Sequence, residues 1–378
     1  MYVSAWQGMA PSLLVRTPRR ASHPYPLGEA STRYYYRARN AIYQLLRALP
    51  LRKGEIVLAP SYHSGNETGA IRAAGGTVRH FGVGRDLSPD LDGMRRLLAE
   101  GARAVLTIHY LGWPQPVEAI RDLSREHGAI LIEDCALSFL STRGGRPLGS
   151  IGDYAVFCLY KTLPIPHGAA LAQNCGVLDS LGSAPLHDPG PLSTLARSSD
   201  LALEWLRSRV DPAGAAMQAA KAWAGGLLDA ARVRRVPVGD MGFSLGDADL
   251  RMSAWVRGLL PRLDYESIVR HRRENFLALL ELLDGAATPL LTELPDGVCP
   301  LFFPILVPDK GAAARALAAR GVCSVEFWNT GDPEACEPDF PDTKFLRTHV
   351  LELPIHQGIG AKQIRHVARA VRESGLHL

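Results

Sequence analysis

The chain has 378 residues, of which 47% are hydrophobic and 21% are charged, and its formal net charge is +4 at pH 7. This balance is ordinary for a globular protein of two domains and argues against a disordered chain. No run of Lys and Arg is dense enough to indicate a nucleic-acid surface, and no segment reaches the roughly 18 continuous apolar residues that a membrane helix needs. We therefore expect a soluble protein that binds neither nucleic acid nor membrane.

The six cysteines are scattered, with no C-x-x-C pair and no neighbouring series of histidines. In a chain of this length the pattern favours reduced, mostly buried thiols and a cytoplasmic location, and it predicts no metal site. The N-terminal stretch also lacks an apolar run of signal length before a cleavage site.

Helices and strands alternate through the first half of the chain after an irregular arm, rich in Pro, Ser and Arg, over residues 1–30. Apolar residues at helical spacing predict helices over 38–49, 66–76, 91–102 and 117–128. Short apolar runs between them predict strands over 55–60, 77–83, 103–110, 129–136 and 153–160. This order predicts an α/β fold with a mostly parallel central sheet flanked by helices, in which ligands bind beyond the carboxyl ends of the strands.

The second half of the chain has a different pattern. Residues 175–240 are rich in small residues and helical Ala/Leu/Arg segments. After them we expect a long helix over 262–284, strands around 301–307 and 323–328, and a closing helix over 361–374. The sequence therefore predicts a large domain over 31–250, in which 175–240 is a divergent helical segment, and a smaller α+β domain over 251–378.

Asp134 ends the strongly apolar strand in the motif IEDCA. A carboxylate at a strand tip facing a crevice can bind a metal, a ribose or a heterocycle nitrogen. It can equally well cap the next turn, so this motif alone leaves its role open.

Lys161 follows the last predicted strand in the motif DYAVFCLYKTLPIPHGAAL and is one of only six lysines. Most lysines are solvated, but the neighbours of this one are apolar, and Pro164, Pro166 and Gly168 restrict the loop that follows. A desolvated amine has a lowered pKa, as a Schiff-base nucleophile requires.

Asp134 and Lys161 together fit the needs of a pyridoxal 5'-phosphate (PLP) ring. Such a ring needs a carboxylate on its pyridine nitrogen, a lysine that reaches its aldehyde carbon, and a helix N-terminus for its phosphate. The helix over 38–49, entered by Arg37, Ala38, Arg39 and Asn40, can supply that N-terminus. A solvated helix start is the alternative for its arginines.

From about residue 38 to the C-terminus, with a gap near 175–240, the chain resembles the DegT-like nucleotide-sugar aminotransferases, which are fold type I PLP enzymes. The matching motifs, in chain order, are LRKGEIVLAPSYHSGNETGAIRAAGGTV, AVLTIHYLGWPQPVEAIRDLSREHGAILIEDCALSF, RGGRPLGSIGDYAVFCLYKTLPIPHGAAL, DLRMSAWV and LPIHQGI. The resemblance implies that Asp134 binds the pyridine nitrogen and that Lys161 is the Schiff-base lysine. It also implies that Ala38 and Arg39 lie against the phosphate, in place of the family's Gly-Thr pair.

Other cofactor contacts are implied by the resemblance but change in residue type. His63 or Ser64 falls where the family often stacks an aromatic ring on the cofactor, although His63 can also be a plain loop residue. Leu137 replaces the family's Gln or His near the phenolic oxygen, and Cys158 replaces its phosphate-binding serine. Only Ser244 or Asp247 is available for a contact that the family makes to the phosphate of the partner subunit.

Four further residues are candidates for lining the substrate pocket: His109, Tyr110, His167 and His356. His109 and Tyr110 follow a strand in the motif HYLGWP, where packing is the simpler role. His167 lies in the loop after Lys161, and His356 belongs to a turn of the smaller domain that can approach the substrate.

The resemblance implies an aminotransferase that moves an amino group from L-glutamate or L-glutamine to a keto-sugar nucleotide or related ketone. It also implies a homodimer with active sites at the interface. Two alternatives stay open: another PLP reaction (a dehydratase, decarboxylase or carbon–carbon lyase), and a catalytically silent regulatory protein of the same fold. Dehydratases of the family commonly carry histidine at the lysine position, so Lys161 argues against that version.

Overall fold

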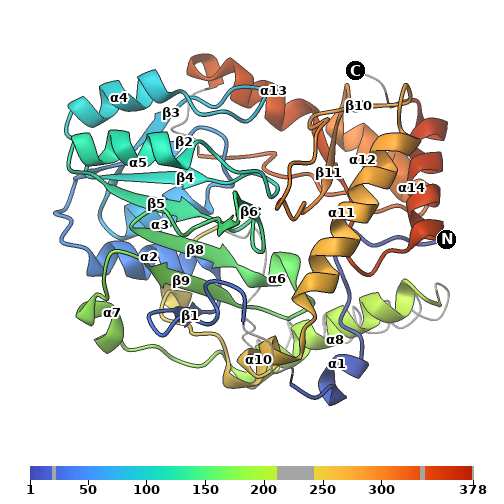
Figure 1. Cartoon of the computed structure of the whole chain (residues 1–378), viewed down its shortest axis with the longest axis horizontal. Coiled ribbons are helices and arrows are strands. Elements are labelled where there is room, and N and C mark those ends of the chain that lie inside the picture. The colour runs from blue at the N-terminus through green and yellow to red at the C-terminus, as the bar shows by residue number, and fades with distance from the viewer. Residues whose placement is uncertain (19–22, 211–241, 333–336, 377–378) are drawn as a thin grey trace.

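The structure, a computed structural model, describes residues 1–18, 23–210, 242–332 and 337–376 (Figure 1). A seven-stranded sheet lies at the centre of the larger part of the molecule, and a three-stranded sheet lies in the smaller part (Figure 1). The order of the large sheet is β1-β9-β8-β5-β4-β2-β3. The strand bounds are β1 Arg33–Tyr35, β2 Ile56–Pro60, β3 Thr77–Phe81, β4 Ala104–Ile108, β5 Ile130–Asp134, β8 Tyr154–Cys158 and β9 Ala169–Gln173.

The five strands β3, β2, β4, β5 and β8 run parallel to one another, whereas β9 is antiparallel to β8 and β1 is antiparallel to β9. Helices α3 (Asn66–Ala73), α4 (Leu91–Ala99) and α5 (Val117–Glu126) make the crossovers between successive parallel strands. The predicted mostly parallel sheet flanked by helices is therefore confirmed.

Successive side chains along each strand point to opposite faces of the sheet, and both faces are covered by helices. Val57 and Ala59 of β2 belong to a core cluster with Leu45 of α2 (Ala38–Ala48). Leu58 points to the opposite face, where it shares a cluster with residues of α4 and α5. The sheet is thus a buried layer whose carboxyl edge is left for loops.

The smaller part contains the antiparallel sheet of β10 (Thr288–Pro289), β11 (Phe303–Leu306) and β12 (Val350–Leu353). Helices α11 (Tyr265–Leu282), α12 (Lys310–Ala319) and α14 (Ala361–Ser374) pack against it around buried Phe276, Phe303 and Val367. The N-terminal arm joins this part, since Val3 forms an isolated parallel bridge with Val322 and belongs to the same cluster.

Short elements complete the described chain. The remaining helices are α1 Ser12–Val15, α6 Leu159–Thr162, α7 Asp179–Ser183, α8 Pro191–Arg207, α10 Ala254–Arg257 and α13 Pro341–His349. Three 3-10 turns span Leu245–Asp247, Leu260–Arg262 and Glu337–Asp339, and β6 (Thr142–Arg143) forms a hairpin with β7 (Arg146–Pro147). Among the described residues, no helix is both long enough and apolar enough to cross a membrane.

The expected strand over 323–328 is wrong. Val325 makes only an isolated bridge to Glu352, and Trp328 has a φ of 57°, which ends the extended conformation. Strands β1 and β9 were not predicted. The boundaries near residues 30 and 250 stay predictions, and residues 211–241 of the divergent helical segment lie outside the described residues.

Candidate active site

Asp134 and Lys161 lie at the carboxyl edge of the large sheet. Asp134 is the last residue of β5, and its neighbour strand β8 ends at Cys158. The chain then turns at once into the single-turn helix α6, which carries Lys161 and lies between the sheet and α11 (Figure 1). Two adjacent parallel strands thus deliver the carboxylate and the amine to one crevice.

One cavity brings together six of the residues predicted from the sequence: Ala38, Arg39, Ser64, Asp134, Cys158 and Lys161. Its other lining residues are Arg37, Ile42, Asn66, Glu67, Ala136 and Tyr160. The cavity is narrow, about 30 Å³. Asn66 and Glu67 were missed, although they open α3 after β2 at the same sheet edge and are separated from the predicted Ser64 only by Gly65.

The Asp134 carboxyl group is fully buried, at 1% exposure. Burial, and next the nearby negative charge of Glu67, raise its pKa to about 7, against the opposing effects of the Ala136 N–H and of Lys161. The Ala136 N–H donates a 2.8 Å hydrogen bond to Oδ1. A buried carboxyl that is costly to ionise is suited to sharing a proton with a basic ring nitrogen.

Lys161 lines the same cavity, and its Nζ is 5.3 Å from the centroid of the Phe327 ring. Phe327 belongs to the segment after α12, so the smaller part of the molecule contributes one wall beside the amine. Thr162, the next residue, is fixed by the smaller part as well, because its carbonyl accepts hydrogen bonds from Gln357 (3.0 Å) and Arg272 (3.3 Å).

The N-terminus of α2 forms the positively charged end of the cavity. Arg37 is the N-cap residue and has no side-chain cap hydrogen bond, and Ala38 and Arg39 form the first turn. The first N–H groups of a helix have no acceptor within the helix, and the helix dipole adds partial positive charge there. Together with two buried arginines, this turn can hold a phosphate dianion.

A polar network connects the loop after β2 with the cavity wall. Ser64 Oγ donates to both carboxylate oxygens of Glu67, at 3.0 and 2.8 Å, and Asn66 Nδ2 donates to Ser64 Oγ at 2.9 Å. Arg39 in turn donates to Asn66. Burial alone raises the pKa of Glu67, but the His63 ring, a backbone N–H and the Ser64 hydroxyl outweigh it and lower that pKa to about 2.

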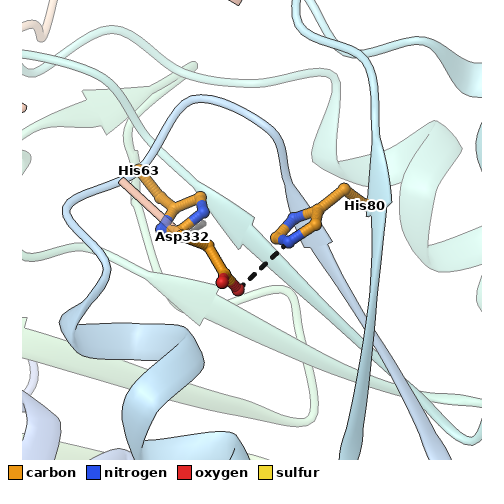
Figure 2. A group of neighbouring side chains, drawn as sticks. All are labelled: His63, His80 and Asp332. Carbon is orange, nitrogen blue, oxygen red and sulfur yellow. Dashed lines mark hydrogen bonds and ion pairs between the residues drawn. The ribbon is translucent and has the colours of Figure 1, made fainter. Parts of the chain in front are cut away.

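His63 lies behind this network instead of on the cavity wall. Its ring is stacked on His80, with centroids 5.2 Å apart and planes 6° apart, and His80 Nε2 lies 3.3 Å from Asp332 Oδ2 (Figure 2). Ligand atoms of the three residues lie within 4.8 Å of one another, which is close enough to suggest a cation site. However, Arg72 already forms a 2.5 Å ion pair with Asp332, and its positive charge opposes a divalent cation there.

Four other predicted residues also lie away from the cavity wall, because their side chains have partners elsewhere. Asn40 donates to the Asp247 carbonyl at 2.5 Å, and Leu137 is buried in the core of the large sheet. His109 is bonded to buried Glu133 at 2.8 Å, and the Tyr110 hydroxyl donates to the Tyr62 carbonyl at 2.8 Å. These contacts support packing and positioning roles.

The last two candidate histidines are neutral and buried. His167 Nε2 lies between the hydroxyls of Thr194 (3.2 Å) and Ser253 (3.3 Å), and His356 Nε2 lies 3.2 Å from the Ser4 carbonyl. Burial lowers the pKa of each ring to about 3. Neither residue lines the cavity around Lys161.

The residues of the cavity fit PLP in the chemistry of their groups. The buried carboxyl of Asp134, with its raised pKa, can bind a ring nitrogen, and the amine of Lys161 can bind an aldehyde carbon. The N-terminus of α2, with its two arginines, can bind a phosphate. The hydrogen-bonding capacity of the carboxyl also fits, since Ala136 occupies only Oδ1 among the contacts of the described residues.

Residues 37–171 match the model of the DegT/DnrJ/EryC1/StrS aminotransferase family, which confirms the predicted resemblance over this stretch. The chain is similar to a dTDP-4-dehydro-2,3,6-trideoxy-D-glucose 4-aminotransferase of Saccharopolyspora spinosa, with 36% identity over 31% of this chain and 31% of that enzyme. It is also similar to a GDP-perosamine synthase of Vibrio cholerae, with 26% identity over 36% of this chain and 38% of that enzyme.

The matched part of the chain thus spans about a third of the length of these curated relatives. Likeness of fold extends much further. A putative sugar aminotransferase from Streptococcus pneumoniae, solved in its PMP form, superposes with a TM-score of 0.71 at 14% identity, covering 99% of this chain and 98% of that one.

Proposed function

We propose that this chain, a relative of the DegT/DnrJ/EryC1/StrS aminotransferases over residues 37–171, is a PLP-dependent aminotransferase. The observation that carries the proposal is the convergence of Lys161, Asp134 and the N-terminus of α2 on one cavity. PLP, when bound, supplies an electron sink that allows a proton to leave the Cα of an amino acid.

The residues of this chain then have separate tasks. Lys161 would hold the cofactor through its amine and, once freed, would take the proton from the Cα of the amino donor and deliver it to the former aldehyde carbon of the cofactor. Asp134 keeps the ring nitrogen protonated. Ala38 and Arg39 hold the phosphate, with Arg37 as a further positive charge at the same end.

We propose L-glutamate or L-glutamine as the amino donor and a keto-sugar nucleotide or related ketone as the acceptor. The names of the similar proteins support this substrate class, since they include a 4-aminotransferase of a dTDP-linked sugar and a GDP-perosamine synthase. The five described cysteines are free thiols, which supports a cytoplasmic location.

A homodimer is part of the proposal. Helix α8 exposes two apolar side chains, Leu192 (52%) and Leu195 (66%), which we place in the proposed dimer interface. The same helix is bonded through Thr194 to His167 in the loop after Lys161, so a partner on α8 would lie close to the site.

The test is a half-reaction screen of the purified, PLP-loaded protein. Addition of L-glutamate or L-glutamine should convert the absorbance of the lysine-linked cofactor to that of the amino form, and a nucleotide-linked keto sugar should restore it. A protein that binds PLP but responds to no amino donor would instead support the silent regulatory alternative. Conversion with release of carbon dioxide or loss of water would support a different PLP reaction.

A further inference from the structure

We propose that Glu67 is a positioning residue that acts on the bound cofactor through Asp134. Its carboxylate places a fixed second negative charge beside Asp134, and this charge strengthens the hold of Asp134 on the protonated ring nitrogen. The inference deepens the proposed function and rests on it for the identity of the ring.

Glu67 is placed for this role by the first turn of α3. It is 9% exposed and lines the same cavity as Asp134 and Lys161. Ser64 Oγ holds both of its carboxylate oxygens, and His63 Nδ1 lies 3.8 Å from its Oε2. The carboxylate therefore has one defined position on the cavity wall.

The His63 ring, which lies beside Glu67, is also fixed in position by its contacts. The ring of His63 is 0% exposed, and its Nδ1 accepts a 2.9 Å hydrogen bond from the N–H of Gly65. The His63 ring also stacks on the ring of His80, which is bonded to Asp332 (Figure 2). With its pKa lowered to about 2, Glu67 stays ionised throughout the neutral range.

A second carboxylate raises the proton affinity of any group beside it. On the cavity wall this group is Asp134, whose raised pKa has the charge of Glu67 as its second cause after burial. With the cofactor bound, the shared proton lies between Asp134 and the ring nitrogen, so the same charge favours the protonated ring. The other charged groups on the cavity wall are Arg37, Arg39 and Lys161, all of opposite sign.

Glu67 can also serve the fold, because an acidic residue in the first turn of a helix is favourable. A purely structural role predicts that Glu67→Gln changes stability without changing where Asp134 or the ring nitrogen titrates. The two roles are therefore separated by titration of those groups and not by activity.

The experiment compares wild type, Glu67→Gln, Glu67→Asp and Glu126→Gln. In the cofactor-free full chain, carbon NMR of labelled aspartate, assigned with Asp134→Asn, should show the pKa of Asp134 falling by about one unit or more in Glu67→Gln. With PLP labelled at the ring nitrogen, nitrogen NMR should show the ring losing its proton at lower pH in that variant. The dissociation constant of PLP should rise about tenfold, since one pKa unit corresponds to a factor of ten.

Glu67→Asp keeps the charge and should restore most of the titration of Asp134 and the ring. Glu126, an exposed residue paired with Arg95, should give wild-type values when replaced by Gln. Unchanged titration of Asp134 and of the ring nitrogen in Glu67→Gln would overturn the inference, even if stability fell. If wild type bound no PLP, the proposed function would fail, whereas the titration of the cofactor-free protein would still decide whether Glu67 acts on Asp134.

Discussion

The pKa of Asp134 is set by its burial and by the charged residues around it. It is buried at the end of β5 and has the negative Glu67 and the positive Lys161 on the same cavity wall. In the cofactor-free protein its pKa is raised to about 7 from the usual value of 3.8, chiefly by burial. The folded protein without cofactor therefore retains a proton that the unfolded chain releases at lower pH.

This difference predicts how stability changes with pH. A carboxyl whose pKa is raised on folding contributes stability below about pH 4, and this contribution is lost as the pH rises through about 7. Asp134→Asn needs no proton, so the cofactor-free variant should be more stable than wild type at pH 8, by on the order of a few kcal/mol, and similar to it at pH 4. Urea unfolding at the two pH values measures the difference.

The comparison of variant with wild type at each pH removes the contributions of all other titrating groups. A stability difference that is the same at pH 4 and pH 8 would contradict the raised pKa of Asp134. Added PLP should reverse the order at pH 8, because the Asp134 carboxyl can share a proton with the ring nitrogen, whereas the asparagine amide cannot supply the negative charge that holds the protonated ring.

At the scale of elements, helix α11 fixes the segment that carries Lys161. Arg272 of α11 is 2% exposed and donates to Gln357 Oε1 at 2.8 Å, to the Leu301 carbonyl at 2.9 Å and to the Thr162 carbonyl at 3.3 Å. Burial lowers its pKa to about 10, so it stays charged at neutral pH. One guanidinium thus connects α6 of the larger part to the smaller part.

Replacement of Arg272 by Met should leave these buried carbonyls without their donor. We expect a loss of about 3 kcal/mol in the free energy of unfolding, together with weaker PLP binding, because Thr162 adjoins Lys161. Chemical denaturation and PLP titration measure the two effects. Arg270→Met, an exposed position on the same helix, is the control and should change neither.

A loss of stability in Arg272→Met with unchanged affinity for PLP would show that α6 does not depend on this contact. Equal effects of the Arg270 and Arg272 substitutions would contradict the role of the buried hydrogen bonds.

The elements that could be predicted from the sequence are those with strong local signals. The α3 and α5 crossovers end at Gly75 and Gly128, whose φ angles of 100° and 64° favour glycine. The antiparallel strand β1 could not be predicted, because Arg33–Tyr35 pairs with Ala169–Leu171 across a long sequence separation. Strand β9 was missed although it also pairs with β8, which lies just before it in the sequence. The residues around Val325 have the apolar pattern of a strand, but among the described residues of this stretch only Val325 pairs with another segment, through its isolated bridge to Glu352.

The candidate site divides in the same way. Asp134 and Cys158 are the last residues of β5 and β8, and Lys161 follows β8; the hydrophobic pattern predicts both strands, and the structure brings the three residues to one cavity. The partners of His167 and His356, namely Thr194, Ser253 and the Ser4 carbonyl, come from distant segments. Sequence patterns carry no information on such contacts, so these histidines could be predicted only as candidates.

At the scale of the whole molecule, the proposed homodimer predicts a surface that the chain shares with a second copy. Leu192 and Leu195 of α8 expose apolar side chains near the loop that follows Lys161. Aspartate at both positions should shift the protein from dimer to monomer in sedimentation at micromolar concentration, and it should weaken PLP binding. Leu277, 50% exposed on α11, is the matched control, and Leu277→Asp should remain a dimer.

Wild type that sediments as a monomer with full PLP occupancy would contradict the proposed dimer. A dimer that survives the substitutions on α8 would place the interface elsewhere on the molecule.

The central claim, that Lys161 and Asp134 hold opposite sides of one PLP ring, has a direct test. The PLP-loaded protein is reduced with borohydride and digested, and the labelled peptide is identified by mass spectrometry in wild type, Lys161→Ala and Asp134→Asn. We expect one phosphopyridoxyl group per chain on Lys161 in wild type, no label in Lys161→Ala, and a label that requires much higher PLP concentration in Asp134→Asn. A label on another lysine, or full labelling of Lys161→Ala, would contradict the account.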